Sequence, residues 1–72
     1  MDITLILTRH ADDRRKIEGI TIEQIKECIR KGSKYRQTDG LKCVYGYVNV
    51  AYKIVNGKCI IKTVFVTKYD GD

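Results

Sequence analysis

The hydrophobic pattern of this sequence changes its period at Gly32, and the change separates a helical part from a sheet part. Before Gly32, the residues Ile22, Ile25 and Ile29 recur at the spacing of a single helix face. After Gly32, apolar and polar residues alternate, which is typical of strands that bury one face. The pattern predicts an α+β fold in which helices pack against a mainly antiparallel sheet.

The residues before this isoleucine-bearing helix predict a strand and a short helix. The run from Ile3 to Leu7 is rich in leucine and β-branched residues and has the length of a strand. Thr8 is suited to cap a polar helix over residues 9–18, and Gly19 is suited to end it in a left-handed conformation.

The second helix carries the clearest boundaries in the sequence. Thr21 and Gln24 form a capping box, in which each side chain accepts a hydrogen bond from the other residue's backbone N–H. Arg30 and Lys31 complement the negative end of the helix dipole, and Gly32 ends the helix.

Glycine also marks the turns of the sheet. Asp39-Gly40 is a dipeptide favoured in two-residue hairpin turns, and it predicts a turn between a strand near residues 34–38 and a strand starting at Leu41. Gly46 lies within a long middle strand and predicts a bulge or bend there.

A second hairpin turn, at Asn56-Gly57, predicts the register of the last two strands. It joins a strand ending at Val55 to one over residues 58–67. On the apolar face, the expected pairs are Val55 with Lys58, Ile54 with Cys59, Tyr52 with Ile61, Val50 with Thr63, and Val48 with Phe65. The opposite face is expected to carry Lys53, Lys58, Ile60, Lys62, Asn49, Tyr47 and Val64.

We therefore predict a single domain over residues 1–72, built as one strand, two short helices and then a three-stranded, mainly antiparallel sheet. The second helix should cover the apolar face of the sheet. The other face should remain partly open, basic and aromatic.

Positive charge is concentrated in the second part of the chain. The net charge is +5, and the segment from Ser33 to Lys68 holds seven basic residues against one acidic residue, Asp39. This distribution favours a polyanionic partner, because phosphates release counterions when lysine or arginine neutralises them. The alternative is a solvated basic face that keeps the protein soluble.

The cysteines and the single histidine do not form a metal-binding pattern. Cys28, Cys43 and Cys59 contain no Cys-x-x-Cys pair, and His10 is distant from all of them in sequence. We expect no metal, no cofactor and reduced, mostly buried thiols in a cytoplasmic protein, with a single disulfide between two of them as the alternative. The apolar runs are too short for a membrane span, and Met1-Asp2 opens no basic leader, so we expect neither membrane association nor a signal peptide.

The densest polar segment, residues 9–16, contains the candidate catalytic residues. His10 and Arg14 are four residues apart and share a helix face, so a histidine for proton transfer would lie beside an arginine that stabilises a phosphate. The alternative is a helix start with solvated ion pairs, such as Asp12 with Lys16, and a histidine that caps the helix or packs against the sheet.

The strands combine basic and aromatic residues, as surfaces that bind unpaired RNA do. Lysine and arginine contact phosphates, while tyrosine stacks on bases. The alternative is that tyrosine is a good strand former and that lysine protects exposed sheet edges. The candidate nucleic-acid-binding residues are Arg9, Arg36, Tyr47, Lys53, Lys58 and Lys62.

The pattern His10-Ala11-x-x-Arg14, followed by Gly19-Ile20-Thr21-x-Glu23-x-Ile25, resembles the opening of a widespread uncharacterised prokaryotic domain family. That family is usually grouped with the RelE/ParE toxin superfamily, whose element order is similar to the one expected here. The family has an arginine just before the glycine, where this chain has Glu18.

The resemblance implies a compact toxin-like fold with a basic sheet face. RelE-type members cleave mRNA on the ribosome, ParE-type members act on gyrase, and many pair with an antitoxin that wraps the basic surface. We therefore expect a small RNA-binding protein, with metal-independent RNA cleavage as its possible activity and an acidic antitoxin as a possible partner. The alternative is a non-catalytic domain that binds an acidic segment by strand addition, or forms a homodimer.

Overall fold

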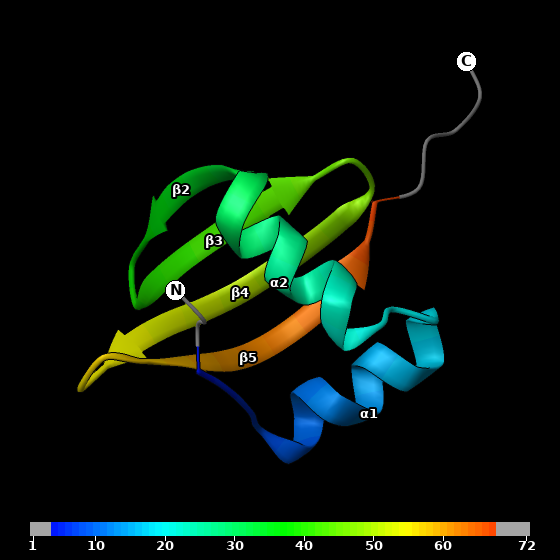
Figure 1. Ribbon diagram of the computed structural model, residues 1–72, viewed down its shortest axis with the longest axis horizontal. Coiled ribbons are helices and arrows are strands. Elements are labelled where there is room, and N and C mark those ends of the chain that lie inside the picture. Colours follow the sequence, from blue (N-terminus) through cyan, green and yellow to red (C-terminus); the bar gives the residue numbers. More distant parts are fainter. Residues whose placement is uncertain (1–3, 68–72) are drawn as a thin grey trace.

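The computed structural model describes residues 4–67, which fold as two helices packed on one side of a five-stranded sheet (Figure 1). The elements are β1 (Leu5–Leu7), α1 (Arg9–Glu18), α2 (Ile22–Lys31), β2 (Ser33–Gln37), β3 (Gly40–Tyr45), β4 (Val48–Val55) and β5 (Lys58–Val66). The strand order is β1-β5-β4-β3-β2, with β1 parallel to β5 and every other pair antiparallel. In this part of the chain, no helix has the length and apolar character needed to cross a membrane.

The predicted α+β class is confirmed, but the predicted three-stranded sheet is wrong in its strand number. Gly46 has a φ of 62° and lies in a turn between β3 and β4, so the expected long middle strand is two strands. The first strand also joins the sheet, because β1 pairs with β5. Ile3, at the start of the predicted first strand, lies outside the described residues.

The first hairpin turn is displaced by one residue from its predicted position. Gln37 pairs with Gly40, so the two turn residues are Thr38 and Asp39 rather than Asp39 and Gly40. Gly40 becomes the first residue of β3, with a φ of 119°.

The helix boundaries agree with their predicted caps. The Thr8 hydroxyl accepts a hydrogen bond from the Ala11 backbone N–H at 3.1 Å. Gly19 ends α1 with a φ of 73°. At the start of α2, the Thr21 N–H donates to the Gln24 side chain at 2.7 Å, and the Gln24 N–H donates to the Thr21 hydroxyl at 3.1 Å. These local bonds satisfy backbone donors that a helix start leaves without partners.

The register between β4 and β5 follows the prediction only from the hairpin turn to the pair of Tyr52 with Ile61. A bulge then shifts the pairing by one residue. The observed pairs beyond the bulge are Ala51–Thr63, Val50–Val64, Asn49–Phe65 and Val48–Val66. The predicted pairs of Val50 with Thr63 and of Val48 with Phe65 are therefore wrong.

The bulge places one extra residue of β5 on the side of the sheet away from the helices. Ile61 and Val64 both have 0% of their surface exposed and both belong to the core, so Lys62 and Thr63 lie between them on the other side. The Lys62 carbonyl accepts a hydrogen bond from the Thr8 hydroxyl at 3.3 Å. The bulge thus contacts the residue that caps α1.

The core lies between α2 and the middle strands. From the helix side it contains Ile25, Cys28 and Ile29, as the isoleucine spacing predicts. The sheet side contributes Cys43, Val50, Tyr52, Cys59, Ile61 and Val64. All three cysteines are buried free thiols.

Gly32 sets how closely the end of α2 approaches β3. Its φ of −73° is open to any residue, so its glycine is required by space and not by backbone conformation. A Cβ atom at this position would lie 2.5 Å from the Cys28 carbonyl oxygen and 2.6 Å from the Val44 carbonyl oxygen.

We expect Gly32→Ala to destabilise the fold by about 2 kcal/mol or more, because both neighbouring atoms belong to the backbone and must move. Gly46→Ala is the matched control. A Cβ there meets nothing within 4 Å, so only its positive φ, of 62°, opposes alanine, at a cost of about 1 kcal/mol. Urea unfolding of both variants measures the difference. Equal losses would contradict the close approach at Gly32.

Burial of a cysteine also makes the stability of the fold vary with pH in the alkaline range. It raises the pKa of the Cys59 thiol from the ordinary 9.0 to about 11. A thiol with a higher pKa in the folded state stabilises that state while it is protonated. Its contribution is therefore complete below about pH 9 and is lost as the pH rises through about 11.

We expect the free energy of unfolding to fall between about pH 9 and about pH 11, and to fall less steeply in Cys59→Ala. Burial also raises the pKa of Tyr52, which leaves some slope in the variant. Urea unfolding across this pH range separates the slope from the constant loss caused by the smaller side chain. The same slope in both proteins would rule out a titrating Cys59.

Candidate nucleic-acid interface

The side of the sheet turned away from the helices is open in the described part of the chain. Its side chains alternate along each strand with the core residues that α1 and α2 cover. We call this surface the open face, and it consists of Ile6, Tyr35, Lys42, Val44, Asn49, Ala51, Lys53, Val55, Lys58, Ile60, Lys62, Thr63 and Phe65. It is basic and partly apolar, and it contains none of the acidic residues of the helices.

A lysine and two aromatic rings lie together near the centre of the open face. The Lys42 Nζ atom lies 5.7 Å from the centroid of the Phe65 ring, a distance at which a cation is attracted to the ring. Tyr35 is the register partner of Lys42 on β2, and 54% of its surface is exposed. The open face therefore offers a positive charge beside aromatic surfaces.

Lys62 connects the open face to the turn between β2 and β3. Its Nζ atom donates to the Asp39 carbonyl oxygen and lies 3.4 Å from an Asp39 carboxylate oxygen. Asp39 is the one acidic residue between positions 33 and 67. Its carboxylate thus partly neutralises a lysine that would otherwise be available to an anionic partner.

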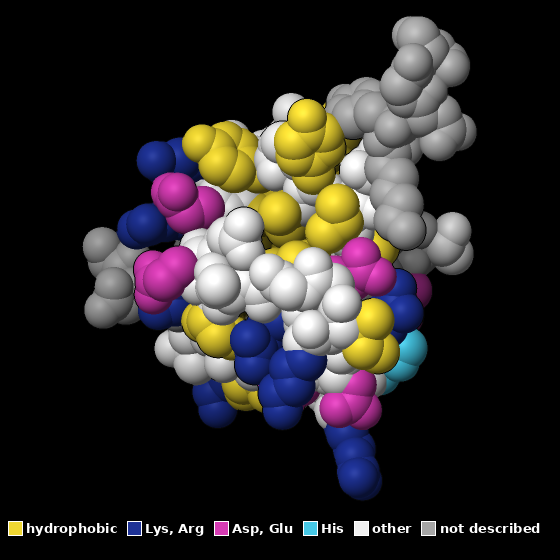
Figure 2. Space-filling view, turned by 90° about the vertical axis from the view of Figure 1, so that its right-hand side faces the viewer, with side chains coloured by type: hydrophobic (Ala, Val, Ile, Leu, Met, Phe, Trp, Pro, Cys, Tyr) yellow, Lys and Arg dark blue, Asp and Glu magenta, His cyan; other side chains and the backbone are white. Residues whose placement is uncertain are grey.

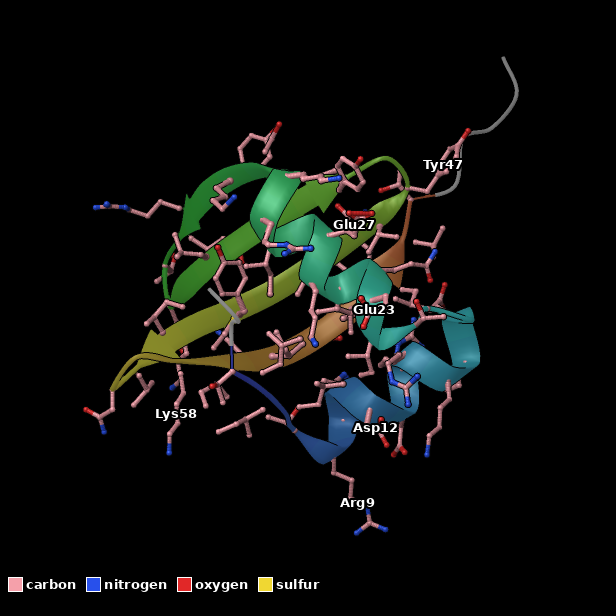
Figure 3. All side chains as sticks on the ribbon, in the orientation of Figure 1. Arg9, Asp12, Glu23, Glu27, Tyr47 and Lys58 are labelled. Carbon is pink, nitrogen blue, oxygen red and sulfur yellow. The ribbon has the colours of Figure 1, made fainter. Side chains whose placement is uncertain are left out.

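The predicted binding residues fall into separate groups. Lys53, Lys58 and Lys62 share the open face. The expected placement of the Val55–Lys58 pair on the apolar face is wrong, because Cys59, the residue after Lys58, is in the core. Arg36 is exposed on β2 but pairs with Leu41, which packs against the core, so it lies on the opposite side of the sheet. Arg9 projects from the start of α1 away from the molecule (Figure 3).

The prediction that Tyr47 joins the lysine-bearing face is wrong, because Tyr47 lies in the turn between β3 and β4. Figure 3 shows it at the opposite end of the sheet from Lys58. Val64, predicted for the same face, is in the core instead. Asn49 is on the predicted side, because it pairs with Val44 and Phe65. It is buried there, and its amide donates to the Tyr47 carbonyl at 3.2 Å and to the Thr67 hydroxyl at 2.5 Å.

Tyr47 instead lines a groove of about 670 Å³ between α2, the end of α1 and the β3–β4 turn. We call it the acidic groove. Its charged side chains are Glu18, Glu23 and Glu27, and its apolar surface comes mainly from Ile20, Tyr45, Tyr47, Val48 and Val66. Figure 2 views this end of the molecule and shows hydrophobic side chains grouped together with acidic ones at their margins.

The electrostatics of the acidic groove differ from those of the open face. Each of its glutamates has a basic neighbour on its own helix: the N–O distances are 3.0 Å for Arg14–Glu18, 4.0 Å for Lys26–Glu23 and 3.0 Å for Lys31–Glu27. These are surface pairs, which contribute little stability. The sequence analysis did not identify this groove, although Glu23 and Glu27 are four residues apart on α2 and therefore share one helix face.

The candidate catalytic residues lie together on α1, but Arg14 is engaged elsewhere. The Arg14 guanidinium donates to the Glu18 carboxylate at 3.0 Å. His10 is exposed, and neither residue lines the acidic groove. Asp12 pairs with Lys16 at 3.2 Å, as predicted for the solvated-helix alternative.

Asp12 also shows how the charges of α1 interact. It lies 3.0 Å from an Arg15 guanidinium nitrogen. Its hydrogen bonds, first to Arg15 and then to Lys16, lower the pKa of the Asp12 carboxyl. Most of the strong contacts of α1 are therefore made within the helix.

Sequence reasoning missed two residues of the open face, Lys42 and Phe65. The predicted register placed Phe65 opposite Val48 on the apolar face, whereas the bulge pairs it with Asn49. No local signal marked the bulge. The alternation of Lys42 with Cys43 already indicates that Lys42 faces away from the core. Its contact with an aromatic ring follows only from the observed position of Phe65.

Within residues 4–67 no three or more histidine, cysteine, aspartate or glutamate side chains are grouped so that they could hold a metal ion. Comparisons of the chain with protein-family models, with curated proteins and with solved structures found no match.

Proposed function

We propose that this protein binds single-stranded RNA on the open face of its sheet. The observation that carries the proposal is the set of lysines interleaved with aromatic rings on a sheet surface that no described element covers. Unpaired RNA exposes both phosphates and base faces, and such a surface contacts both.

The lysines supply the phosphate contacts. Lys42, Lys53 and Lys62 come from three neighbouring strands, β3, β4 and β5. Adjacent strands are about 4.8 Å apart, so the three ammonium groups are spread across the sheet and can contact successive phosphates of one strand. Such contacts release counterions and therefore weaken as salt concentration rises.

The aromatic rings supply the stacking surface. Phe65 and Tyr35 lie on opposite sides of Lys42, on β5 and β2. Base stacking on an aromatic ring contributes about 1–3 kcal/mol per base and does not depend strongly on the base. We therefore propose weak sequence preference and a strong preference for unpaired over double-stranded RNA.

The strands carry almost no acidic charge. Between positions 33 and 67, Asp39 is the single acidic residue, while the other described acidic residues lie on α1 and α2. The acidic groove is formed by the helices and the β3–β4 turn. Most lysines of the open face are therefore not neutralised by a neighbouring carboxylate, whereas basic residues of α1 and α2 pair with acidic residues of their own helix.

Kinship with the RelE/ParE superfamily, and with it RNA cleavage, is a further part of the proposal. His10 is the proposed proton carrier. Arg14 would have to exchange its bond with Glu18 for a phosphate before it could stabilise a cleavage transition state. The arrangement of side chains supports binding more directly than cleavage, because the lysines of the open face lie on the sheet and both candidate catalytic residues lie on α1.

We expect the double variant Lys42→Ala/Lys53→Ala to bind a fluorescent single-stranded RNA on the order of tenfold more weakly than the native chain. Anisotropy titrations between about 50 mM and about 200 mM salt should give a shallower salt dependence for the variant, by about 0.7 for each phosphate that the missing lysines no longer neutralise. Gel analysis of the same RNA reports whether it is cleaved, and His10→Ala then tests the proton carrier.

The matched control is Lys16→Ala/Lys26→Ala, which removes the same charge from the helices. It should bind RNA nearly as well as the native chain. Equal losses of affinity in both double variants would mean that net charge, and not the open face, accounts for binding. An absence of binding by the native chain at low salt would refute the proposed function.

We expect Asp39→Asn to bind the same RNA more tightly, by about two- to fivefold, because it removes the carboxylate beside Lys62 and one negative charge. The comparison is Asp13→Asn, which makes the same change on α1. Anisotropy at low salt measures both. A similar gain in the two variants would show that Asp39 has no special effect on Lys62.

An acidic protein segment is the second candidate partner, and the edge of the sheet favours it. β2 is an edge strand, all five of its residues are exposed, and it carries Lys34 and Arg36. An added strand could pair with its free backbone groups. Indifference to RNA together with binding of an acidic peptide, or with a dimer in light scattering, would favour this candidate.

A further inference from the structure

Two of the three cysteines meet across the boundary between α2 and the sheet. Cys28 of α2 and Cys43 of β3 each have 0% of their surface exposed, and their Sγ atoms lie 3.1 Å apart. A disulfide bond is about 2.05 Å long, so the two sulfur atoms need to approach by about 1 Å. We propose that Cys28 and Cys43 are a redox-active dithiol that closes to a disulfide between α2 and β3.

This proposal is independent of RNA binding, because both thiols lie in the core and not on the open face. The surrounding backbone already holds the two elements close together. A Cβ atom on Gly32 would lie 2.5 Å from the Cys28 carbonyl oxygen and 2.6 Å from the carbonyl oxygen of Val44, the residue after Cys43. The end of α2 is therefore seated directly on β3 beside the thiol pair.

The two thiols differ in reactivity. The hydrogen bond between them lowers the pKa of Cys28 and raises the pKa of Cys43. Lys34, the register partner of Cys43, also lowers the pKa of Cys28 through its charge. Cys28 therefore loses its proton first and is the attacking sulfur, because the thiolate is the nucleophilic form.

Cys59, the third cysteine, is not part of this thiol pair. It is 1% exposed on β5, and burial alone raises its pKa to about 11. It pairs with Ile54 of β4 and Leu5 of β1. We expect it to remain a thiol when the other two are oxidised.

A hydroperoxide is the oxidant, since a small molecule can reach a buried thiol during local opening of α2. The Cys28 thiolate attacks one peroxide oxygen, the O–O bond breaks, and the departing hydroxide takes up a proton. This gives a sulfenic acid on Cys28. The Cys43 sulfur then attacks the Cys28 sulfur, and the S–O bond breaks to release water. Two thiols and one hydrogen peroxide thus give one disulfide and two waters.

The disulfide would join residues 15 positions apart and hold the end of α2 against the sheet. Closing a loop of this size in the unfolded chain reduces its conformational entropy. For a chain of this length, a stabilisation of about 3 kcal/mol corresponds to a rise in the midpoint of thermal unfolding of roughly 20 °C.

The experiment treats the folded protein with hydrogen peroxide and then alkylates it under denaturing conditions. We expect intact mass spectrometry to show the loss of two hydrogens and one alkylated thiol, against three in the untreated protein. Peptide mapping without reductant should link Cys28 to Cys43. Cys59→Ser should form the same link and leave no alkylated thiol, whereas Cys43→Ser should form no intramolecular link.

Three alkylated thiols after treatment would overturn the proposal, as would a link that includes Cys59 or added oxygen without a link. The map of the native chain decides the question even if Cys43→Ser does not fold. Oxidation of the urea-unfolded chain serves as the reference. If pairing there were as selective as in the folded protein, the selectivity would not come from the fold and the proposal would fail.

Discussion

The close approach of the end of α2 to β3 is the constraint on which the rest of the molecule depends. It exists because Gly32 has no side chain at a point where two backbone carbonyl oxygens would lie only 2.5 and 2.6 Å from a Cβ atom. At that separation Ile25, Cys28 and Ile29 enter the same core as Cys43. One side of the sheet is thereby covered by apolar contacts, and the lysines of β3, β4 and β5 are left on the other side. The thiol pair and the basic surface are thus consequences of one packing arrangement.

Local signals in the sequence predicted the parts of the fold that local physics determines. The capping box at Thr21 and the left-handed Gly19 need only their neighbours, so both could be identified from a few residues. The turn at Asn56-Gly57 determined the register near the hairpin for the same reason. The bulge beyond Tyr52 and the parallel pairing of β1 with β5 depend on residues far apart in sequence. Periodicity alone contains no information about either.

The candidate site was predictable only where the strand near it was regular. Lys53 is close to the hairpin turn, where the alternation of side chains is uninterrupted, and it lies on the open face as expected. Tyr47 was misplaced because the predicted strand continued beyond Val48, where β4 begins, into the turn at Gly46. Phe65 was misplaced because the count passed through the bulge. An error of one residue moves every following side chain to the other side of the strand. The prediction therefore failed abruptly at each turn or bulge, and not gradually with distance from the hairpin.

The parallel pairing of β1 with β5 has a consequence for how the chain acquires its structure. Leu5 finds its partner at Cys59, and the Thr8 hydroxyl that caps α1 also bonds the carbonyl of Lys62, 54 positions away. Contacts of such separation form slowly, because a long loop must close before they contribute. During synthesis, the three-residue β1 has no strand partner among the described residues until β5 leaves the ribosome. The protein must therefore complete its sheet as one late event, after the helices and the inner hairpins have formed.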